Sequence, residues 1–215
     1  MTSDTPTEHR PLRADAERNR VRLLTAAREV FAAHGLAVSL DDVARHAGVG
    51  VGTLYRRFPN KDALVDAVFD HALDELFAAV ADIAADPDPW RAITRLVEEL
   101  VRRQSADRGL YEICTKVGLG RMERITAQYV PIVDTLVARA RAEGTLRPDV
   151  APSDIAVLVI MVTATAEATR AADPDHWRRY LTLLLDGLRA PGTTPLPVAA
   201  LTHEELEVAI RDARF

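Results

Sequence analysis

The chain has 215 residues, 48% of them hydrophobic and 27% charged, which is typical of a soluble globular protein with one or two domains. A single cysteine excludes an intramolecular disulfide and a four-cysteine zinc site. The net charge of −5 argues against nucleic acid as a partner, but the charge is unevenly distributed. Residues 10–61 contain ten Lys and Arg against five Asp and Glu, and a local basic patch of this kind is typical of a DNA-binding surface.

The first part of the chain predicts a polar arm and one helix. Residues 1–12 are polar and contain two prolines, so we expect them to be disordered. Leu24 and Phe31 belong to an apolar stripe with helical spacing, which predicts a helix over residues 15–34. The arginines within residues 10–22 form either an arm that enters the DNA minor groove or a merely polar segment.

Two short helices follow, with a glycine-containing turn between them. Ser39 is a good N-cap for the first, which ends before Gly48. The second covers residues 51–58, because Pro59 lacks a backbone donor and disfavours helix at the residue before it. This arrangement is typical of a helix-turn-helix, in which the second helix enters the major groove by its N-terminal end.

Glycines at positions 48, 50 and 52 admit another interpretation, the phosphate-binding loop of a nucleotide-binding protein. Such a loop follows a strand and has a different glycine spacing, so the helix-turn-helix explains more. Bare positions let a helix backbone approach DNA closely, and Tyr55, Arg56 and Arg57 then span the remaining gap to phosphates and bases. The alternatives are a Tyr55 ring buried beside the first helix and two arginines on a solvated face.

The remainder of the chain predicts only helices. The expected ranges are 61–85, 90–106, 109–119 (a short helix or turn), 122–142, 152–172, 175–189 and 202–212. The sequence therefore predicts an all-α protein with an N-terminal arm (1–12), a three-helix helix-turn-helix domain (13–60), a helical domain (61–190) that opens with the connecting helix 61–85, and a proline-rich linker with a short C-terminal helix (191–215).

Two apolar stretches in the C-terminal part predict self-association. Residues 155–162 are apolar on all sides, and leucines recur at helical spacing over residues 181–188. Two helices from each of two subunits would form an isologous four-helix bundle, whereas in a monomer both stretches would be ordinary core. The predicted interface residues are Ile155, Leu158, Val159, Val162, Leu181, Leu184, Leu185 and Leu188.

Residues 20–64 resemble the DNA-binding domain of the TetR family of bacterial transcription regulators. The resemblance is carried by Ala27 and Phe31 before His34-Gly35, by Val43-Ala44, Ala47-Gly48-Val49, Gly52-Thr53-Leu54-Tyr55 and Phe58, and by Lys61-Asp62 with Leu64. It implies that phosphates are contacted by Ser39, Thr53, Tyr55 and Lys61, and that bases are read by Val51, Gly52 and Arg56. Two positions depart from the family pattern: Gly50 stands where serine is common, and Arg57, which would contact phosphate or base, stands where tyrosine or histidine is common.

The same resemblance implies a helical C-terminal domain for ligand binding and dimerisation. The protein would be a homodimeric repressor that binds a palindromic operator and is released by a small-molecule effector. Candidate pocket residues are Trp90, Ile93, Val97, Tyr111, Met122, Tyr129, Met161 and Thr165.

Other classes of protein fit the sequence less well. A helical enzyme or an adaptor without DNA binding is the alternative, but the six histidines are scattered and no hydrolase, metalloprotease or P-loop motif occurs. We therefore expect no catalytic residue, no cofactor and no metal. The N-terminal residues lack an apolar signal region and no apolar run reaches the length of a membrane helix, so we expect a cytoplasmic protein without a membrane partner.

Overall fold

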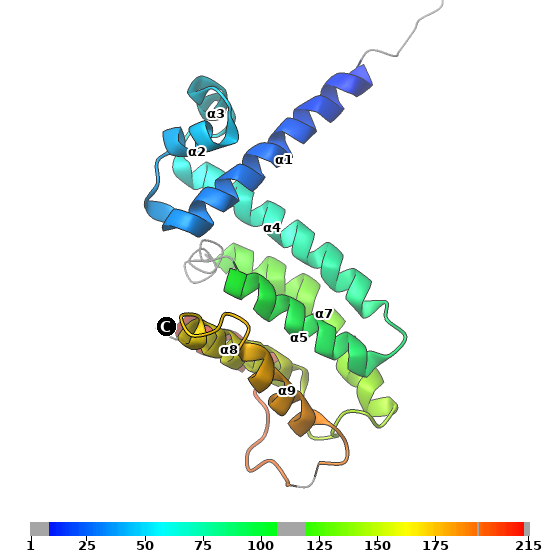
Figure 1. Cartoon of the computed structure of the whole chain (residues 1–215). Coiled ribbons are helices and arrows are strands. Elements are labelled where there is room, and N and C mark those ends of the chain that lie inside the picture. Colours follow the sequence, from blue (N-terminus) through cyan, green and yellow to red (C-terminus); the bar gives the residue numbers. More distant parts are fainter. Residues whose placement is uncertain (1–8, 107–118, 193, 213–215) are drawn as a thin grey trace, which may run out of the picture. The chain divides into compact units, whose positions relative to one another are not determined.

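The computed structural model describes residues 9–106, 119–192 and 194–212, and this part of the chain is helical without a strand, so the all-α prediction is confirmed (Figure 1). The elements are α1 (His9–His34), the 3-10 turn η1 (Gly35–Ala37), α2 (Leu40–Ala47), α3 (Val51–Arg57), α4 (Lys61–Ala84), α5 (Pro89–Ala106), α7 (Leu119–Ala142), α8 (Pro152–Thr169), α9 (Trp177–Leu188) and α10 (His203–Asp212). The helix or turn predicted over 109–119 lies almost entirely outside the described residues.

Helix α1 begins earlier than the sequence predicted. It starts at His9 rather than near residue 15, so residues 9–12 are helical and the prediction of a disordered arm is wrong for them. Pro11 does not prevent this, because the N–H groups of a first helical turn have no intrahelical acceptor. Residues 1–8 lie outside the described part.

The predicted caps around the two short helices are confirmed. Ser39 Oγ accepts a hydrogen bond from the Asp42 N–H (3.2 Å), and the Asp42 carboxylate accepts one from the Ser39 N–H (3.2 Å), which completes a capping box. Gly48 ends α2 with φ 65°, a left-handed conformation that favours glycine. Asn60 Oδ1 accepts the Ala63 N–H (2.8 Å) at the start of α4.

The packing divides the described chain into two units, and the division falls inside α4. Residues up to Leu73 belong to an N-terminal unit, and residues from Asp74 onward belong to a C-terminal unit. The sequence placed this boundary at residues 60 and 61. It falls later because Leu64 and Val68, in the first turns of α4, are buried in the N-terminal core.

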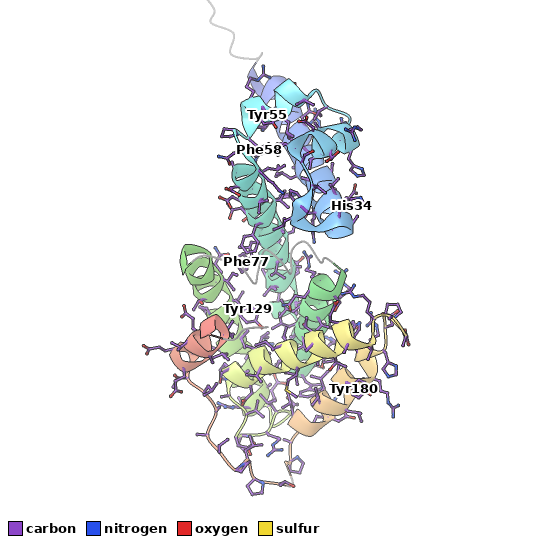
Figure 2. All side chains as sticks on the ribbon, turned by 90° about the vertical axis from the view of Figure 1, so that its left-hand side faces the viewer. His34, Tyr55, Phe58, Phe77, Tyr129 and Tyr180 are labelled. Atoms are coloured by element: carbon purple, nitrogen blue, oxygen red, sulfur yellow. The ribbon has the colours of Figure 1, made fainter. Side chains whose placement is uncertain are left out.

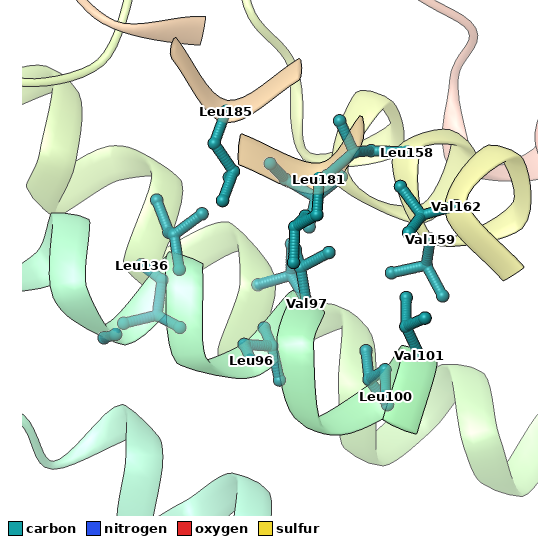
Figure 3. Packing of buried hydrophobic residues seen from close by; sticks show 14 of the residues in the cluster. Leu96, Val97, Leu100, Val101, Leu136, Leu158, Val159, Val162, Leu181 and Leu185 are labelled. Carbon is teal, nitrogen blue, oxygen red and sulfur yellow. The ribbon is translucent and has the colours of Figure 1, made fainter. Parts of the chain in front are cut away.

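The core of the C-terminal unit is built around α5. One side of this helix presents Leu96, Val97, Leu100 and Val101 to side chains from α7, α8 and α9 (Figure 3). Leu136 of α7, Val159 of α8 and Leu181 of α9 are among those neighbours, and all are buried. The helix predicted over residues 90–106 therefore forms the centre of this unit, and its apolar side chains contact three other helices.

Helix α8 is the one helix in the described part that has the length and apolarity of a membrane span. Seven of its residues, among them Ile155 and Val162, are buried in the C-terminal unit. Its inward side therefore belongs to a protein core, and core helices of this kind commonly share the composition of membrane helices.

A buried carboxylate joins α4, α5 and α7 at one corner of the C-terminal unit. Asp86 accepts hydrogen bonds from Arg91 Nε (2.8 Å), Arg91 Nη2 (2.6 Å) and Arg95 Nη1 (3.3 Å). Arg139 of α7 donates to the backbone carbonyls of Ala84 (3.2 Å) and Asp86 (2.9 Å). The Arg91 guanidinium holds the pKa of Asp86 well below its usual range, so this carboxylate stays ionised at the corner.

Replacing Asp86 with asparagine tests this corner through the dependence of stability on pH. The folded-state pKa lies below the unfolded value, so the ionised carboxylate stabilises the fold above roughly pH 4 and loses this effect as pH falls through the folded pKa. Asp86→Asn should therefore lower the Tm at pH 7, and the gap from wild type should narrow below about pH 4. Asp82→Asn, an exposed position on α4, is the control in a thermal-unfolding series. A difference in Tm between wild type and Asp86→Asn that stays constant from neutral to acid pH would contradict the stabilising role of the ionised carboxylate.

Candidate nucleic-acid interface

Helix α3 has one buried side and one exposed side. Leu54 is fully buried and Phe58, directly after the helix, is 6% exposed; both lie in the core of the N-terminal unit with Leu24 and Val43. The remaining side chains of α3 are exposed: Val51, Gly52, Thr53, Tyr55, Arg56 and Arg57. The six residues of α3 predicted to contact DNA therefore form a single exposed face.

The exposure of two large side chains on this face bears on the alternative in which the Tyr55 ring is buried beside the first helix. Tyr55 is 45% exposed and Val51 is 41% exposed (Tyr55 is labelled in Figure 2). Tyr55 does not bury its ring beside the first helix, because the core positions there are filled by Leu54 and Phe58. Two large exposed apolar side chains therefore lie on the same short helix as Arg56 and Arg57.

Gly52 has no internal reason to be glycine. A Cβ atom built at this position would meet nothing within 4 Å, and its φ angle is not in the left-handed region. Glycine inside a helix costs roughly 1 kcal/mol relative to alanine, so the residue weakens a helix of seven residues without improving its packing. The structure around Gly52 therefore leaves room for a larger side chain at this position.

The arginine side chains of the N-terminal unit differ in whether they have an interaction partner within the protein. Between residues 18 and 73, where side chains are described, Arg22 and Arg56 are exposed and have no partner. Arg45 pairs with Asp42 at 3.1 Å, and Arg57 takes part in another interaction. Arg56, in the last turn of α3, is therefore the cation of this face that is available to a new partner.

Two of the predicted phosphate contacts are held by the protein itself. Ser39 Oγ donates to the Asp42 carboxylate (2.6 Å) while it caps α2, so its proton is already used. The Lys61 ammonium is half-buried and donates to the Leu36 carbonyl of η1. These contacts hold the start of α2 and the start of α4, and the sequence had revealed the first role but not the bond from Lys61.

The predicted pocket residues differ in how deeply they are buried in the C-terminal unit. Ile93 and Val97 are sealed in the core, at 1% and 0% exposure. The Trp90 ring is covered by the Arg189 guanidinium, 4.6 Å from its centroid. Met161 points to solvent on α8, with 49% exposure.

The other four pocket candidates carry polar groups or have side chains outside the described part of the chain. The Thr165 hydroxyl donates to the Met161 carbonyl (2.9 Å), within its own helix. Tyr129 packs against the core of the C-terminal unit, and burial raises the pKa of its phenol above the usual range (Figure 2). Tyr111 and the side chain of Met122 lie outside the described residues. Tyr129 is therefore a predicted pocket residue that lies partly buried against this core.

The structure also corrects the predicted dimer interface. Six of the eight residues (Ile155, Leu158, Val159, Val162, Leu181 and Leu185) are at most 5% exposed, inside the core of their own C-terminal unit. Leu184 and Leu188 pack partly buried against that core. The leucine stripe had identified the inward side of α9. The large apolar residues of α8 and α9 that are exposed are Met161, Tyr180 and Leu183. The sequence signal for an outward apolar side was the apolar character of α8 on all sides.

No group of three or more His, Cys, Asp or Glu side chains that could hold a metal ion occurs in the described part of the chain.

Comparisons with known proteins give two matches in chain order. Residues 23–68 match the family described as bacterial regulatory proteins, tetR family, and residues 88–190 match the description Transcriptional regulator SbtR-like, C-terminal domain. A solved TetR transcription regulatory protein from Mycobacterium vanbaalenii is 34% identical, with a TM-score of 0.65, over 84% of this chain and 100% of that one.

Curated relatives match over shorter stretches. The HTH-type transcriptional regulator SAR0097 of Staphylococcus aureus is 38% identical over 38% of this chain and 44% of its own length. The HTH-type transcriptional repressor KstR2 of Rhodococcus jostii is 39% identical over 31% of this chain and 33% of its own length. The chain thus spans less than half of either relative, whereas it covers the solved structure completely. The chain belongs to the TetR family of bacterial transcription regulators.

Proposed function

We propose that this regulator is a repressor that binds a palindromic DNA operator as a homodimer and leaves it when a small-molecule effector binds. The observation that carries the proposal is the face of α3, where an unexplained glycine at position 52 lies beside the unpartnered Arg56. Repression is supported by KstR2, a relative that is itself named a repressor. The protein would act in the cytoplasm, without a cofactor.

The side chains of α3 suit the two kinds of DNA contact. A guanidinium such as that of Arg56 can donate two parallel hydrogen bonds to the major-groove edge of guanine. Thr53 and Tyr55 offer hydroxyl donors to phosphate oxygens, which position a protein on DNA without specifying sequence. Gly52 allows the backbone to come close enough for these side chains to reach. Ser39 and Lys61 would join these contacts only by exchanging their internal acceptors for phosphate oxygens.

A homodimer would explain how so short a recognition helix can specify a DNA site. The seven residues of α3 can contact only a few bases, whereas two copies related by a two-fold axis read both halves of a palindrome. The exposed residues Met161, Tyr180 and Leu183 of α8 and α9 supply the apolar surface for such pairing. The proposed interface is the outward side of the two helices.

Helix α4 would transmit the effect of ligand binding to the DNA-binding unit. It contributes Leu64 to the core of the N-terminal unit and Val80 to the core of the C-terminal unit. A ligand that prefers one arrangement of the C-terminal helices would thereby shift the population of dimers toward one that fits the operator poorly. Tyr129, which is partly buried against the core of the C-terminal unit, would offer such a ligand a hydroxyl group.

Selection of bound sequences from a random pool of duplex DNA tests the function directly. We expect an enriched palindrome whose half-sites are separated by about one helical turn or a multiple of it. Binding should weaken steeply as salt increases, because phosphate contacts release counterions. Failure to enrich any duplex at low ionic strength, without added small molecules, would contradict the proposal.

Arg56→Ala tests the reading role of α3. Loss of the guanidinium should weaken binding to the selected operator by about 1–3 kcal/mol and relax the preference at one position of each half-site. Fluorescence anisotropy on the operator and on single-base variants measures both effects. Arg102→Ala, which removes an exposed arginine paired with Glu99 on α5, is the charge-matched control and should bind as wild type. Equal losses in the two variants would contradict a specific role for Arg56.

Leu183→Glu tests the proposed pairing of α8 and α9. A carboxylate placed where apolar side chains meet costs free energy, so the dissociation constant of the dimer should rise by about tenfold or more. Ala81→Glu, at an exposed position of α4, adds the same charge elsewhere and should remain dimeric. Analytical ultracentrifugation over a range of concentrations separates the two outcomes. A Leu183→Glu protein that dimerises like wild type would show that the interface lies elsewhere.

A further inference from the structure

Helix α1 extends well beyond the core that it helps to form. It begins at His9, whereas its first buried residue, among the side chains described from residue 18 onward, is Leu23. At a rise of 1.5 Å per residue, residues 9–22 form a helical projection about 21 Å long. These residues precede the range 23–68 that matches the regulator family, so that match assigns them no role.

The projection, residues 9–22, is rich in arginine. Against two acidic residues, Asp15 and Glu17, it carries five arginines: Arg10, Arg13, Arg18, Arg20 and Arg22. Arg22 is exposed and, like Arg56 of α3, has no partner in the part of the N-terminal unit whose side chains are described. The excess of positive charge near α3 therefore continues onto the first turns of α1.

The projection and α3 belong to one unit and lie at the same end of it. Leu24 of α1 and Leu54 of α3 share the core of the N-terminal unit, which holds the two helices together. Figures 1 and 2 both place α3 and the N-terminal end of α1 at the upper end of this unit. A polyanion that contacts the exposed face of α3 would therefore meet a second basic element at that end.

The helical form of the projection limits how it could meet DNA. The sequence had left open an arm that enters the minor groove. An α-helix with its side chains is about 10–12 Å across, whereas the minor groove of B-DNA is about 6 Å wide, so a helix does not fit inside it. The sugar-phosphate backbone remains accessible to arginines on a helix, because a guanidinium can donate two parallel hydrogen bonds to a phosphate.

We infer that residues 9–22 of α1 form a second DNA contact, in which their arginines bind phosphates of the duplex outside the half-site read by α3. The inference rests on the proposed operator binding and adds a requirement for flanking DNA of any sequence. Phosphate contacts of this kind raise affinity through counterion release and carry no sequence information. The projection is about as long as six base pairs, so the contacted flank lies within this distance of each half-site.

Operator duplexes of two lengths test this contact. The short duplex ends at the outer edges of the selected half-sites, and the long duplex carries roughly ten further base pairs on each side. We expect wild type to bind the long duplex about tenfold more tightly in fluorescence anisotropy. Arg13→Gln combined with Arg22→Gln should reduce this ratio to about twofold or less, with binding to the short duplex and the thermal-unfolding midpoint unchanged.

Arg102→Gln combined with Arg170→Gln is the charge-matched control. Both arginines are exposed in the C-terminal unit, where they pair with Glu99 and Glu167. This control pair should keep the wild-type ratio between the two duplexes. Changing the base sequence of the flanks should also leave the ratio as it is, because phosphates are the same in every sequence.

The outcomes separate this contact from operator binding itself. Equal affinity of wild type for the two duplexes would overturn the inference and leave the reading of the half-sites intact. A variant of α1 that kept the preference for the long duplex, or lost affinity equally for both, would overturn it as well, as would loss of the preference in the control pair or a preference that depends on flank sequence. If neither duplex bound, the proposed function would fail and the inference with it.

Discussion

The burial of Leu54 and Phe58 in the N-terminal core is the constraint on which the proposed function depends. A helix of seven residues cannot fold alone, and these two side chains attach α3 to α1, α2 and the first turns of α4. Because successive residues of a helix are about 100° apart, fixing Leu54 inward turns Gly52, Tyr55 and Arg56 outward. The capping box of Ser39 begins α2, and the left-handed Gly48 ends it and sets the turn that leads into α3.

The C-terminal unit depends on a similar division of each helix into two sides. Helix α5 is surrounded by the inward sides of α7, α8 and α9, and this leaves the outward sides of α8 and α9 uncovered. The ionised Asp86 joins the end of α4 to the start of α5, and Arg139 of α7 binds the same corner through backbone carbonyls. The C-terminal end of α4 is thus held by the charged groups around Asp86. The first turns of α4 belong to the apolar core of the N-terminal unit.

Local signals in the sequence predicted most of the helices and the helix-turn-helix. Capping residues and prolines mark helix ends directly, which is why Ser39 and Pro59 were interpreted correctly. Long-range contacts have no such mark. The Lys61 bond to Leu36 and the arginines around Asp86 join residues that the sequence pattern does not relate. The leucine periodicity of α9 identifies an apolar side but not its neighbour, so Leu181 and Leu185 were assigned to a partner when their own core buries them.

Photocrosslinking from α3 tests most directly whether its exposed face meets DNA. Tyr55 would be replaced by p-benzoylphenylalanine, and Ala81, an exposed position of α4 outside the proposed interfaces, would receive the same replacement as a control. The account predicts crosslinks to the operator duplex from position 55 and none from position 81. Crosslinks from position 81 alone, or from neither position while the duplex remains bound, would contradict it.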